Sequence, residues 1–285
     1  MIEKSTASVD RKAAETRFHD ELRGERSGDE RLHANDKYYS VTKSSEQFVV
    51  DWLGERCRGK KVLDYGCGNG EFTRLLAQGG ADAYGIDISP VSVDIARKAA
   101  EQQGLAKCAT FEVMDAEATE FPDNYFDYVH VGGVLHHLDL MPAYRELARI
   151  LKPNGAAICA EALKHNPILH LYRKLTPHLR TAWEVEHILG RSEIYSATSY
   201  FEEVRVLKCF NLLSIAAAPL RNTPAFKPAV RILEGIDDVL LRLPGLKWQA
   251  WIVVFLLAKP KRAPLYEAMA GQGVTTEMPL SRKGI

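Results

Sequence analysis

The stretch VLDYGCGNGEF, Val62–Phe72, places three glycines at alternate positions directly behind a short apolar run. The apolar run predicts a buried strand, and the residues after Gly70 predict a helix. A glycine-rich turn between a strand and a helix lets a ligand touch the backbone where a Cβ would clash, and the helix N-terminus offers N–H groups. The turn by itself is weak evidence for a ligand, because a tight structural loop has the same glycines.

Strand and helix patterns alternate on both sides of this turn. Strands are predicted at 61–66, 82–88, 109–115, 126–135, 156–162, 204–210 and 247–260, and helices between them. Because a parallel neighbour is reached only through a crossover, this alternation predicts a parallel sheet covered on both faces. The expected fold is α/β: a doubly wound, seven-stranded, mostly parallel, Rossmann-like sheet with helical insertions that form a substrate lid.

The helices have predicted inner faces. The helix at 71–78 is expected to face the sheet with Phe72, Leu75 and Leu76. The next helix is expected to begin at Ser89-Pro90, since serine is a good N-cap and proline suits the first helical position. Its expected inner stripe is Val91, Ile95 and Ala99.

The chain divides into five predicted parts. Residues 1–36 form a mobile or helical arm, 37–162 the ligand-binding core, and 163–246 two insertions around the sixth strand that set substrate specificity. Residues 247–259 form the final strand and 260–285 a tail rich in glycine, proline and charge.

Composition excludes several classes of protein. Lys plus Arg and Asp plus Glu both number 37, so no net charge attracts the chain to nucleic acid or to an anionic membrane. The longest apolar run, 251–258, is too short to cross a bilayer, and the charged N-terminus is unlike a secretion signal. Five scattered cysteines without a CxxC pair argue against disulfides and zinc. We expect a soluble, cytoplasmic protein. The sequence is also compatible with a homodimer.

Two acidic residues end the second and third predicted strands. Asp87 lies 21 positions after Gly66, where a carboxylate can accept hydrogen bonds from ribose hydroxyls. Asp115 can accept a hydrogen bond from an exocyclic amine, with Met114 or Ala116 against an adenine face. Each also has a structural interpretation, Asp87 as a helix cap and Asp115 as a turn residue. The glycine spacing, G-x-G-x-G, lacks the third-glycine offset of the dinucleotide fingerprint and therefore disfavours NAD.

At these motifs the chain resembles the class I S-adenosylmethionine-dependent methyltransferases, in particular the small-molecule branch that includes ubiquinone/menaquinone-biosynthesis enzymes. VLDYGCGNGEFT is similar to the first motif of the family, YGIDIS to the second, VMDAEA to the third, FDYVHVGGVLHHL to the fourth and ILKPNGAAICAE to the fifth. The resemblance covers residues 60–162. It implies S-adenosylmethionine as cofactor and a final strand antiparallel to the others.

The resemblance also implies a set of cofactor contacts. Asp64 would lie near the ammonium of the methionyl part, Asp87 would hold the ribose, and Asp115 would hold the adenine. A carboxylate at position 64 would repel a pyrophosphate but suits a positive amine, which again favours S-adenosylmethionine over NAD. The full expected set is Tyr39, Asp64, Gly66, Cys67, Gly68, Asp87, Ile88, Asp115, Ala116 and Val131. Tyr39 either closes the pocket or only fastens the N-terminal segment to the core.

Three histidines are candidate catalytic residues: His136, His137 and His187. A base is needed only if the acceptor loses a proton, and histidine titrates near neutral pH. Paired histidines after the fourth strand are common in the family, so a structural role is the alternative. No metal site is expected, since Asp139 is the only carboxylate close to them in the sequence.

The insertion that begins at Leu163 has its own composition. From Leu163 to Ala182 it has four basic residues, three histidines and no carboxylate. One interpretation is an amphipathic lid helix, capped by Asn166 and opened by Pro167, with Ile168, Leu171, Tyr172 and Leu175 turned inward and its charges solvated. The other gives it a role in substrate binding, in which Arg173 or Arg180 pairs with a carboxylate or phosphate of the acceptor. Glu161, at the end of the fifth strand, and His187 are further candidates for contact with the acceptor.

The expected function is methyl transfer from S-adenosylmethionine to a small molecule, most simply to oxygen. An alternative is C- or N-methylation of an isoprenoid, lipid or polyketide, for which the apolar residues of 226–246 would form a groove. Packing against the sheet explains the same residues. A nicotinamide-dependent oxidoreductase and a non-catalytic scaffold subunit are the remaining alternatives.

Overall fold

A seven-stranded sheet forms the centre of the computed structural model, which describes residues 2–23, 40–175 and 182–262. Its order is β3-β2-β1-β4-β5-β7-β6. The strands are β1 Lys61–Tyr65, β2 Asp82–Asp87, β3 Ala109–Val113, β4 Phe126–Gly132, β5 Leu151–Ala162, β6 Phe201–Phe210 and β7 Ile252–Pro260.

The strand directions confirm the predicted fold class. Strands β1 to β5 pair in parallel, and β7 is antiparallel to both of its neighbours, β5 and β6. The strand order reverses between β1 and β4, which pair with Tyr65 opposite Val131. In open α/β sheets, ligands bind outside the carboxyl ends of the strands at such a reversal. The topology therefore places a candidate site beyond Tyr65 and Gly132.

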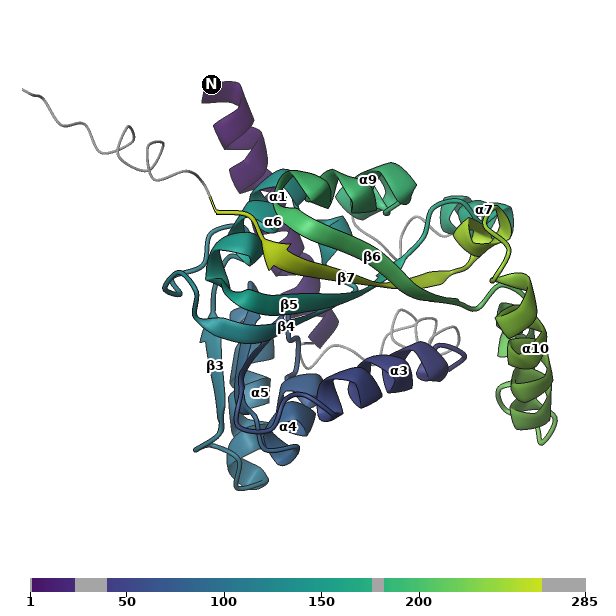
Figure 1. Ribbon diagram of the computed structural model, residues 1–285, viewed down its shortest axis with the longest axis horizontal. Coiled ribbons are helices and arrows are strands. Elements are labelled where there is room, and N and C mark those ends of the chain that lie inside the picture. The colour runs from purple at the N-terminus through teal and green to yellow at the C-terminus, as the bar shows by residue number, and fades with distance from the viewer. Residues whose placement is uncertain (1, 24–39, 176–181, 263–285) are drawn as a thin grey trace, which may run out of the picture.

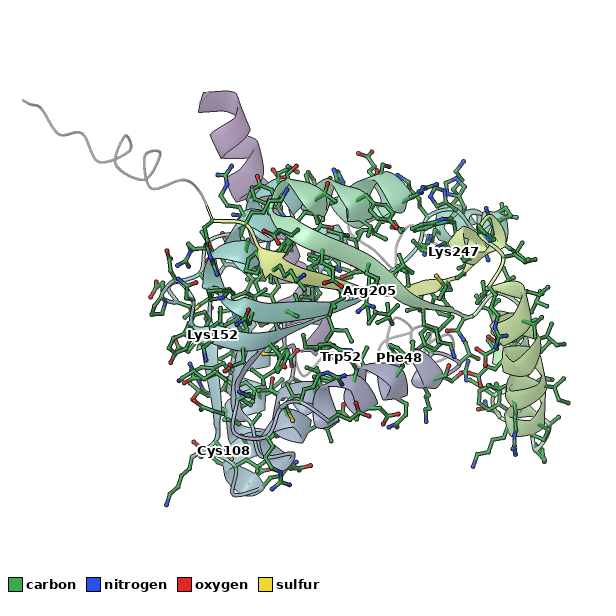
Figure 2. The ribbon with its side chains drawn as sticks, viewed as in Figure 1. Phe48, Trp52, Cys108, Lys152, Arg205 and Lys247 are labelled. Carbon is green, nitrogen blue, oxygen red and sulfur yellow. The ribbon has the colours of Figure 1, made fainter. Side chains whose placement is uncertain are left out.

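Helices cover both faces of the sheet (Figure 1). One face is covered by α3 Lys43–Gly54, α4 Glu71–Gln78 and α5 Pro90–Gln102, and the other by α6 Leu140–Ile150 and α9 Arg191–Ser196. On α3, Phe48 and Trp52 lie on the side toward the sheet (Figure 2), where their rings contact Phe210 and Tyr128 edge to face. The two buried clusters on either face hold the sheet rigid behind the candidate site.

The remaining helices lie at the ends of the sheet or beside it. They are α1 Ile2–Arg23, α7 Pro167–Leu175, α8 Ala182–His187 and α10 Phe226–Leu240, with 3-10 turns at Leu135–His137, Ala197–Ser199, Ser214–Leu220 and Leu246–Gln249. Within the described ranges, none of the helices is both long and apolar enough to cross a bilayer.

Three predicted inner faces are partly wrong. On α5, Ile95 is exposed and the buried positions are Ser92, Val93, Ala96 and Ala100. The small alanines let the helix approach the sheet closely, so the buried stripe is rotated by one residue. On α4, Leu75 is exposed because it faces a cavity.

The lid helix is the third case. Asn166 caps α7 as expected, since its Oδ1 accepts a hydrogen bond from the Leu169 amide at 3.1 Å. Leu171, predicted to face inward, is 57% exposed, whereas Leu169 and Arg173 are buried. The amide of Asn166 also donates to the Gln249 carbonyl at 2.8 Å, which fixes the rotation of the helix about its axis. The side chains of Ile168, Tyr172 and Leu175 lie outside the described residues.

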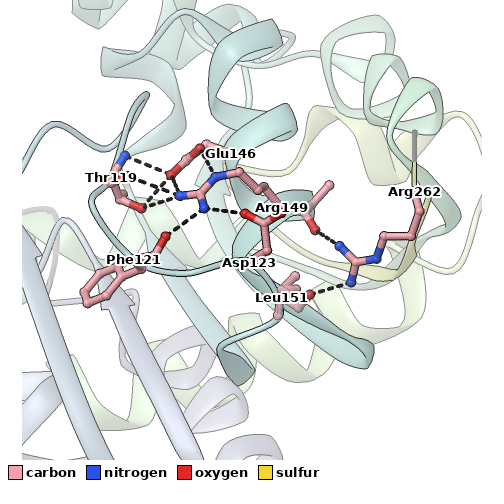
Figure 3. Close-up of polar contacts among 8 residues, drawn as sticks. Thr119, Phe121, Asp123, Glu146, Arg149, Leu151 and Arg262 are labelled. Atoms are coloured by element: carbon pink, nitrogen blue, oxygen red, sulfur yellow. Dashed lines mark hydrogen bonds and ion pairs between the residues drawn. The ribbon is translucent and has the colours of Figure 1, made fainter. Parts of the chain in front are cut away.

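A polar network anchors α6 to the loop that precedes β4 (Figure 3). The Arg149 guanidinium contacts Glu146 at 2.6 Å and Asp123 at 2.7 Å, and it donates to the carbonyls of Phe121 and Thr119. Glu146 is buried and also accepts from the Thr119 amide at 2.8 Å. Loss of the guanidinium would leave a buried carboxylate and two carbonyls without this partner.

Replacing Arg149 with methionine is therefore expected to lower the free energy of unfolding by about 1–3 kcal/mol, the cost of stranding buried polar groups. Arg145→Met, on the exposed side of the same helix, is the matched control and should change stability by less than about 0.5 kcal/mol. Chemical denaturation followed by circular dichroism measures both. Equal stability of the two variants would show that the network contributes nothing measurable.

Candidate active site

Two cavities meet at Gly132 and Gly133, directly after β4. The first cavity has about 770 Å³ of free space, part of it open to solvent, and the second about 1320 Å³. Both glycines line both cavities. Because neither glycine has a side chain, groups bound on the two sides can approach each other closely.

The first cavity is lined by the carboxyl ends of β2 and β3, by the segment after β4 and by α1. Its apolar lining is Ile86, Ile88, Met114, Ala116, Val134 and Leu138, and its carboxylates are Glu15, Asp87, Asp115 and Glu117. Apolar side chains beside carboxylate acceptors suit a nucleoside, whose base is flat and apolar and whose ribose and amine donate hydrogen bonds. Among the residues expected from the sequence, Gly66, Asp87, Ile88, Asp115 and Ala116 line this cavity.

The glycine loop is shaped by its own backbone conformation. Gly66, Gly68 and Gly70 have φ values of 81°, 52° and 72°, which are unfavourable for other residues. A Cβ at Gly70 would overlap Phe111 and Ala96, and one at Gly66 would overlap Val134. The loop therefore needs these glycines for its own path and packing, whatever ligand it approaches.

Asp87 holds the loop in place. One carboxylate oxygen accepts from the Gly68 amide at 2.8 Å, and the other accepts from the Ser89 amide at 2.9 Å. Ser89 is the N-cap of α5, as predicted, since its hydroxyl accepts from the Ser92 amide at 3.0 Å. Because the Gly68 amide donates to a carboxylate of the protein, it does not point at a bound phosphate. The loop therefore differs from a pyrophosphate-binding loop.

Asp64 lies in the interior behind the loop. Its carboxylate accepts from the Thr73 hydroxyl at 2.7 Å and contacts His130 Nδ1 at 2.8 Å. The His130 ring stacks on Phe72 with 3.8 Å between centroids, and both rings line the second cavity. Asp64 thus fixes the orientation of a histidine in the cavity wall. The sequence suggested neither Thr73 nor His130 as part of the site.

His136 is oriented in the same way by Glu161. Its Nδ1 lies 2.7 Å from the Glu161 carboxylate, which also accepts from the amides of Val134 and Leu135 at 2.8 Å each. Glu161 is fully buried, and His136 lines the second cavity. An Nδ1–H bonded to a carboxylate leaves Nε2 as the basic nitrogen. The pair has the arrangement of a base and the group that orients it.

The second cavity lies between α3, α4 and the ends of β4, β5 and β7. Its apolar walls are Val49, Val50, Phe72, Leu75, Ala160, Ala162, Trp251 and Ile252, and its polar lining is Thr42, Ser45, Glu46, Glu71, His130 and His136. A mostly apolar cavity with two oriented histidines suits an apolar molecule that carries a polar reacting group.

The N-terminal helix α1 covers the first cavity, which the sequence did not predict. Lys12 lies 2.5 Å from Asp115 and 2.9 Å from Glu117, and Arg11 donates to the His137 carbonyl at 2.6 Å and to Glu117 at 2.5 Å. Burial opposes the charged form of Lys12, but its hydrogen bonds to Asp115 and Glu117 outweigh burial and raise its pKa. The Lys12 ammonium is therefore charged throughout the neutral pH range. The contacts of Arg11 and Lys12 join residues more than 100 positions apart in the chain. A single sequence contains no pattern that predicts such contacts.

The other predicted site residues lie elsewhere. Tyr39 and Arg180 are outside the described residues. Cys67, Gly68 and Val131 are close to lining residues in the sequence but are not among the described residues that line the cavities.

The expected substrate-binding and catalytic residues have other contacts. Arg173 is buried and donates to the Leu163 carbonyl at 2.9 Å, so its charge points into the protein. His187 stacks on Trp183 at 3.6 Å, and Glu161 lies behind His136.

The segment that contains most of the site residues matches a known domain in sequence comparisons. The family model described as a methyltransferase domain matches residues 63–159, about a third of the chain. The sterol 24-C-methyltransferase of Aspergillus fumigatus is 32% identical over 127 residues, 44% of this chain and 33% of that protein. The demethylmenaquinone methyltransferase of Geobacillus sp. is 33% identical over 122 residues, 41% of this chain and 51% of that protein. The chain spans about half or less of the length of these curated relatives.

Solved structures show the same fold. The geranyl diphosphate C-methyltransferase of Streptomyces coelicolor, solved with Mg²⁺, geranyl-S-thiolodiphosphate and S-adenosyl-L-homocysteine, aligns with a TM-score of 0.53 and 16% identity. The alignment covers 77% of this chain and 76% of that one. At this identity the likeness concerns the fold alone.

The matches confirm the resemblance to class I methyltransferases of the small-molecule branch. Residues 63–159 are a methyltransferase domain, and its cofactor is S-adenosylmethionine. The first cavity fits this cofactor: its described lining has four carboxylates against two cations, Arg11 and Lys12, which suits a ligand with a net positive charge. We propose that Asp87 holds the ribose and Asp115 the adenine, beside Ile88, Met114 and Ala116, which line the same cavity.

Replacing Asp87 with alanine is expected to weaken S-adenosylhomocysteine binding by about 1–3 kcal/mol, because the ribose and the Gly68 amide both lose an acceptor. Isothermal titration calorimetry measures the affinity. Asp82→Ala, at the opposite end of the same strand, is the control and should bind normally. Unchanged affinity in a folded Asp87→Ala variant would show that Asp87 does not bind the cofactor.

Proposed function

We propose that the protein transfers a methyl group from S-adenosylmethionine to an oxygen of a small, largely apolar acceptor bound in the second cavity. The observation that carries this proposal is the His136–Glu161 pair in the wall of that cavity, close in sequence to the two glycines shared with the first cavity. A positioned base is useful only for an acceptor that must lose a proton, such as a phenol or an enol.

The residues of the chain would act chiefly by placement and by accepting a proton. S-adenosylmethionine supplies an already activated methyl group, so alignment of the acceptor and exclusion of water lower most of the barrier. Phe72, Leu75 and Trp251 would hold the apolar body of the acceptor. His136 Nε2 would take the proton, and the buried carboxylate of Glu161 would stabilise the resulting imidazolium.

Methylation at carbon is the second candidate. It is supported by the sterol 24-C-methyltransferase among the curated relatives, and loss of a proton from a phenol or enol also makes the adjacent carbon nucleophilic. A cytoplasmic location, a homodimer and the five-part division of the chain remain predictions.

The test incubates the purified protein with methyl-labelled S-adenosylmethionine and pools of apolar phenols and enols. The expected result is one labelled product, whose carbon-13 shift separates a methoxyl group from a C-methyl group. If the protein binds the cofactor but labels no acceptor of this kind, the proposed acceptor class is wrong.

His136→Ala is expected to lower kcat by about 100-fold or more, the usual contribution of a general base. The affinity for S-adenosylhomocysteine should not change, because His136 lines the second cavity and not the first. His170→Ala, an exposed histidine on α7, is the matched control. A normal kcat in His136→Ala would show that His136 is not a general base and that catalysis comes only from the alignment of the acceptor with the methyl group.

A further inference from the structure

Glu15, His19 and His137 form a cluster of potential metal ligands on the wall of the first cavity. Glu15 and His19 are four residues apart on α1 and therefore share one face of the helix. His137 comes from the turn after β4, more than 100 positions later in the chain. The sequence expectation of no metal considered only Asp139, because nothing in the sequence indicates that α1 packs on this turn.

The distances between the donor atoms fit a bound ion. Glu15 Oε2 lies 3.1 Å from His137 Nδ1 and 3.8 Å from His19 Nε2, and all three donor atoms lie within 4.8 Å of one another. Ligands at zinc distances of about 2.0–2.1 Å in a tetrahedral arrangement are about 3.3 Å apart. The cluster would need only small side-chain movements to hold one ion.

The surrounding charges permit a cation. Arg11 and Lys12 are the cations in the described lining of this cavity, and both form ion pairs, Arg11 with Glu117 and Lys12 with Asp115 and Glu117. Glu15 is 4% exposed as a whole residue, so little water screens its charge. With both histidines neutral, the described lining of the cavity has an excess of two negative charges.

We propose that Glu15, His19 and His137 bind one divalent transition-metal ion, with zinc as the reference ion. Two imidazoles and one carboxylate are a donor set that zinc and its neighbours accept, and three protein ligands leave a coordination position open toward the cavity. The ion would also fasten α1 to the turn after β4. This site does not depend on the proposed function, because the metal can bind whether or not a methyl group is transferred.

The test is a titration of the full-length, chelator-treated protein with Zn²⁺ by calorimetry and with Co²⁺ by visible absorption. We expect one ion per chain with a dissociation constant of about 10 µM or below, and Co²⁺ bands typical of tetrahedral or five-coordinate nitrogen and oxygen ligation. Hydrogen exchange of the α1 amides should slow when Zn²⁺ is added.

Two variants and one control assign the ligands. Glu15→Gln and His19→Ala should each weaken Zn²⁺ binding at least about 10-fold, and circular dichroism shows whether they remain folded. His165→Ala, an exposed histidine before α7, should bind as the unmodified protein does. Absence of stoichiometric binding, or affinity unchanged in both variants, would overturn the proposal. Bands typical of thiolate ligation would do the same, because they would place the ion at a cysteine such as Cys108.

Discussion

The hydrogen bond from the Gly68 amide to the Asp87 carboxylate is the contact on which the geometry of the site depends. It ties the glycine loop after β1 to the end of β2, while the second oxygen of Asp87 holds the Ser89 amide at the start of α5. One half-buried carboxylate thus fixes two segments, the loop after β1 and the start of α5, beside the point where the strand order reverses. The loop conformation, with φ of 52° at Gly68, is available at low cost only to glycine.

Buried carboxylates set the rest of the site in the same way. Asp64 orients His130 and Glu161 orients His136, so two imidazoles are held in the wall of the second cavity. Glu161 is fully buried and accepts two backbone amides as well, and such charge-assisted bonds offset the cost of burying its charge. The arrangement is preorganised, which is what catalysis by placement requires.

The sequence was sufficient for the parts of the structure that follow from local pattern. Alternating strands and helices predicted the sheet, and acidic residues at strand ends predicted that Asp87 and Asp115 would line one cavity. The inner faces of helices were less predictable, because alanines on α5 pack where Ile95 was expected and Leu75 on α4 faces a cavity. The contacts of α1 were missed, since ion pairs such as Lys12–Asp115 join distant residues and leave no periodic signal. The composition of the 163–182 insertion allows Arg173 either a solvated position or a contact with the substrate, whereas the side chain is buried and donates a hydrogen bond to a carbonyl inside the protein.

If the cofactor lies in the first cavity, the two glycines separate it from the acceptor in the second. A crystal structure of the protein with S-adenosylhomocysteine would test this arrangement most directly. We expect a ribose within hydrogen-bonding distance of Asp87, an adenine beside Asp115 and Met114, and a sulfur atom next to Gly132 and Gly133, facing the second cavity. A nucleoside in the second cavity, or a sulfur atom remote from these glycines, would contradict this arrangement.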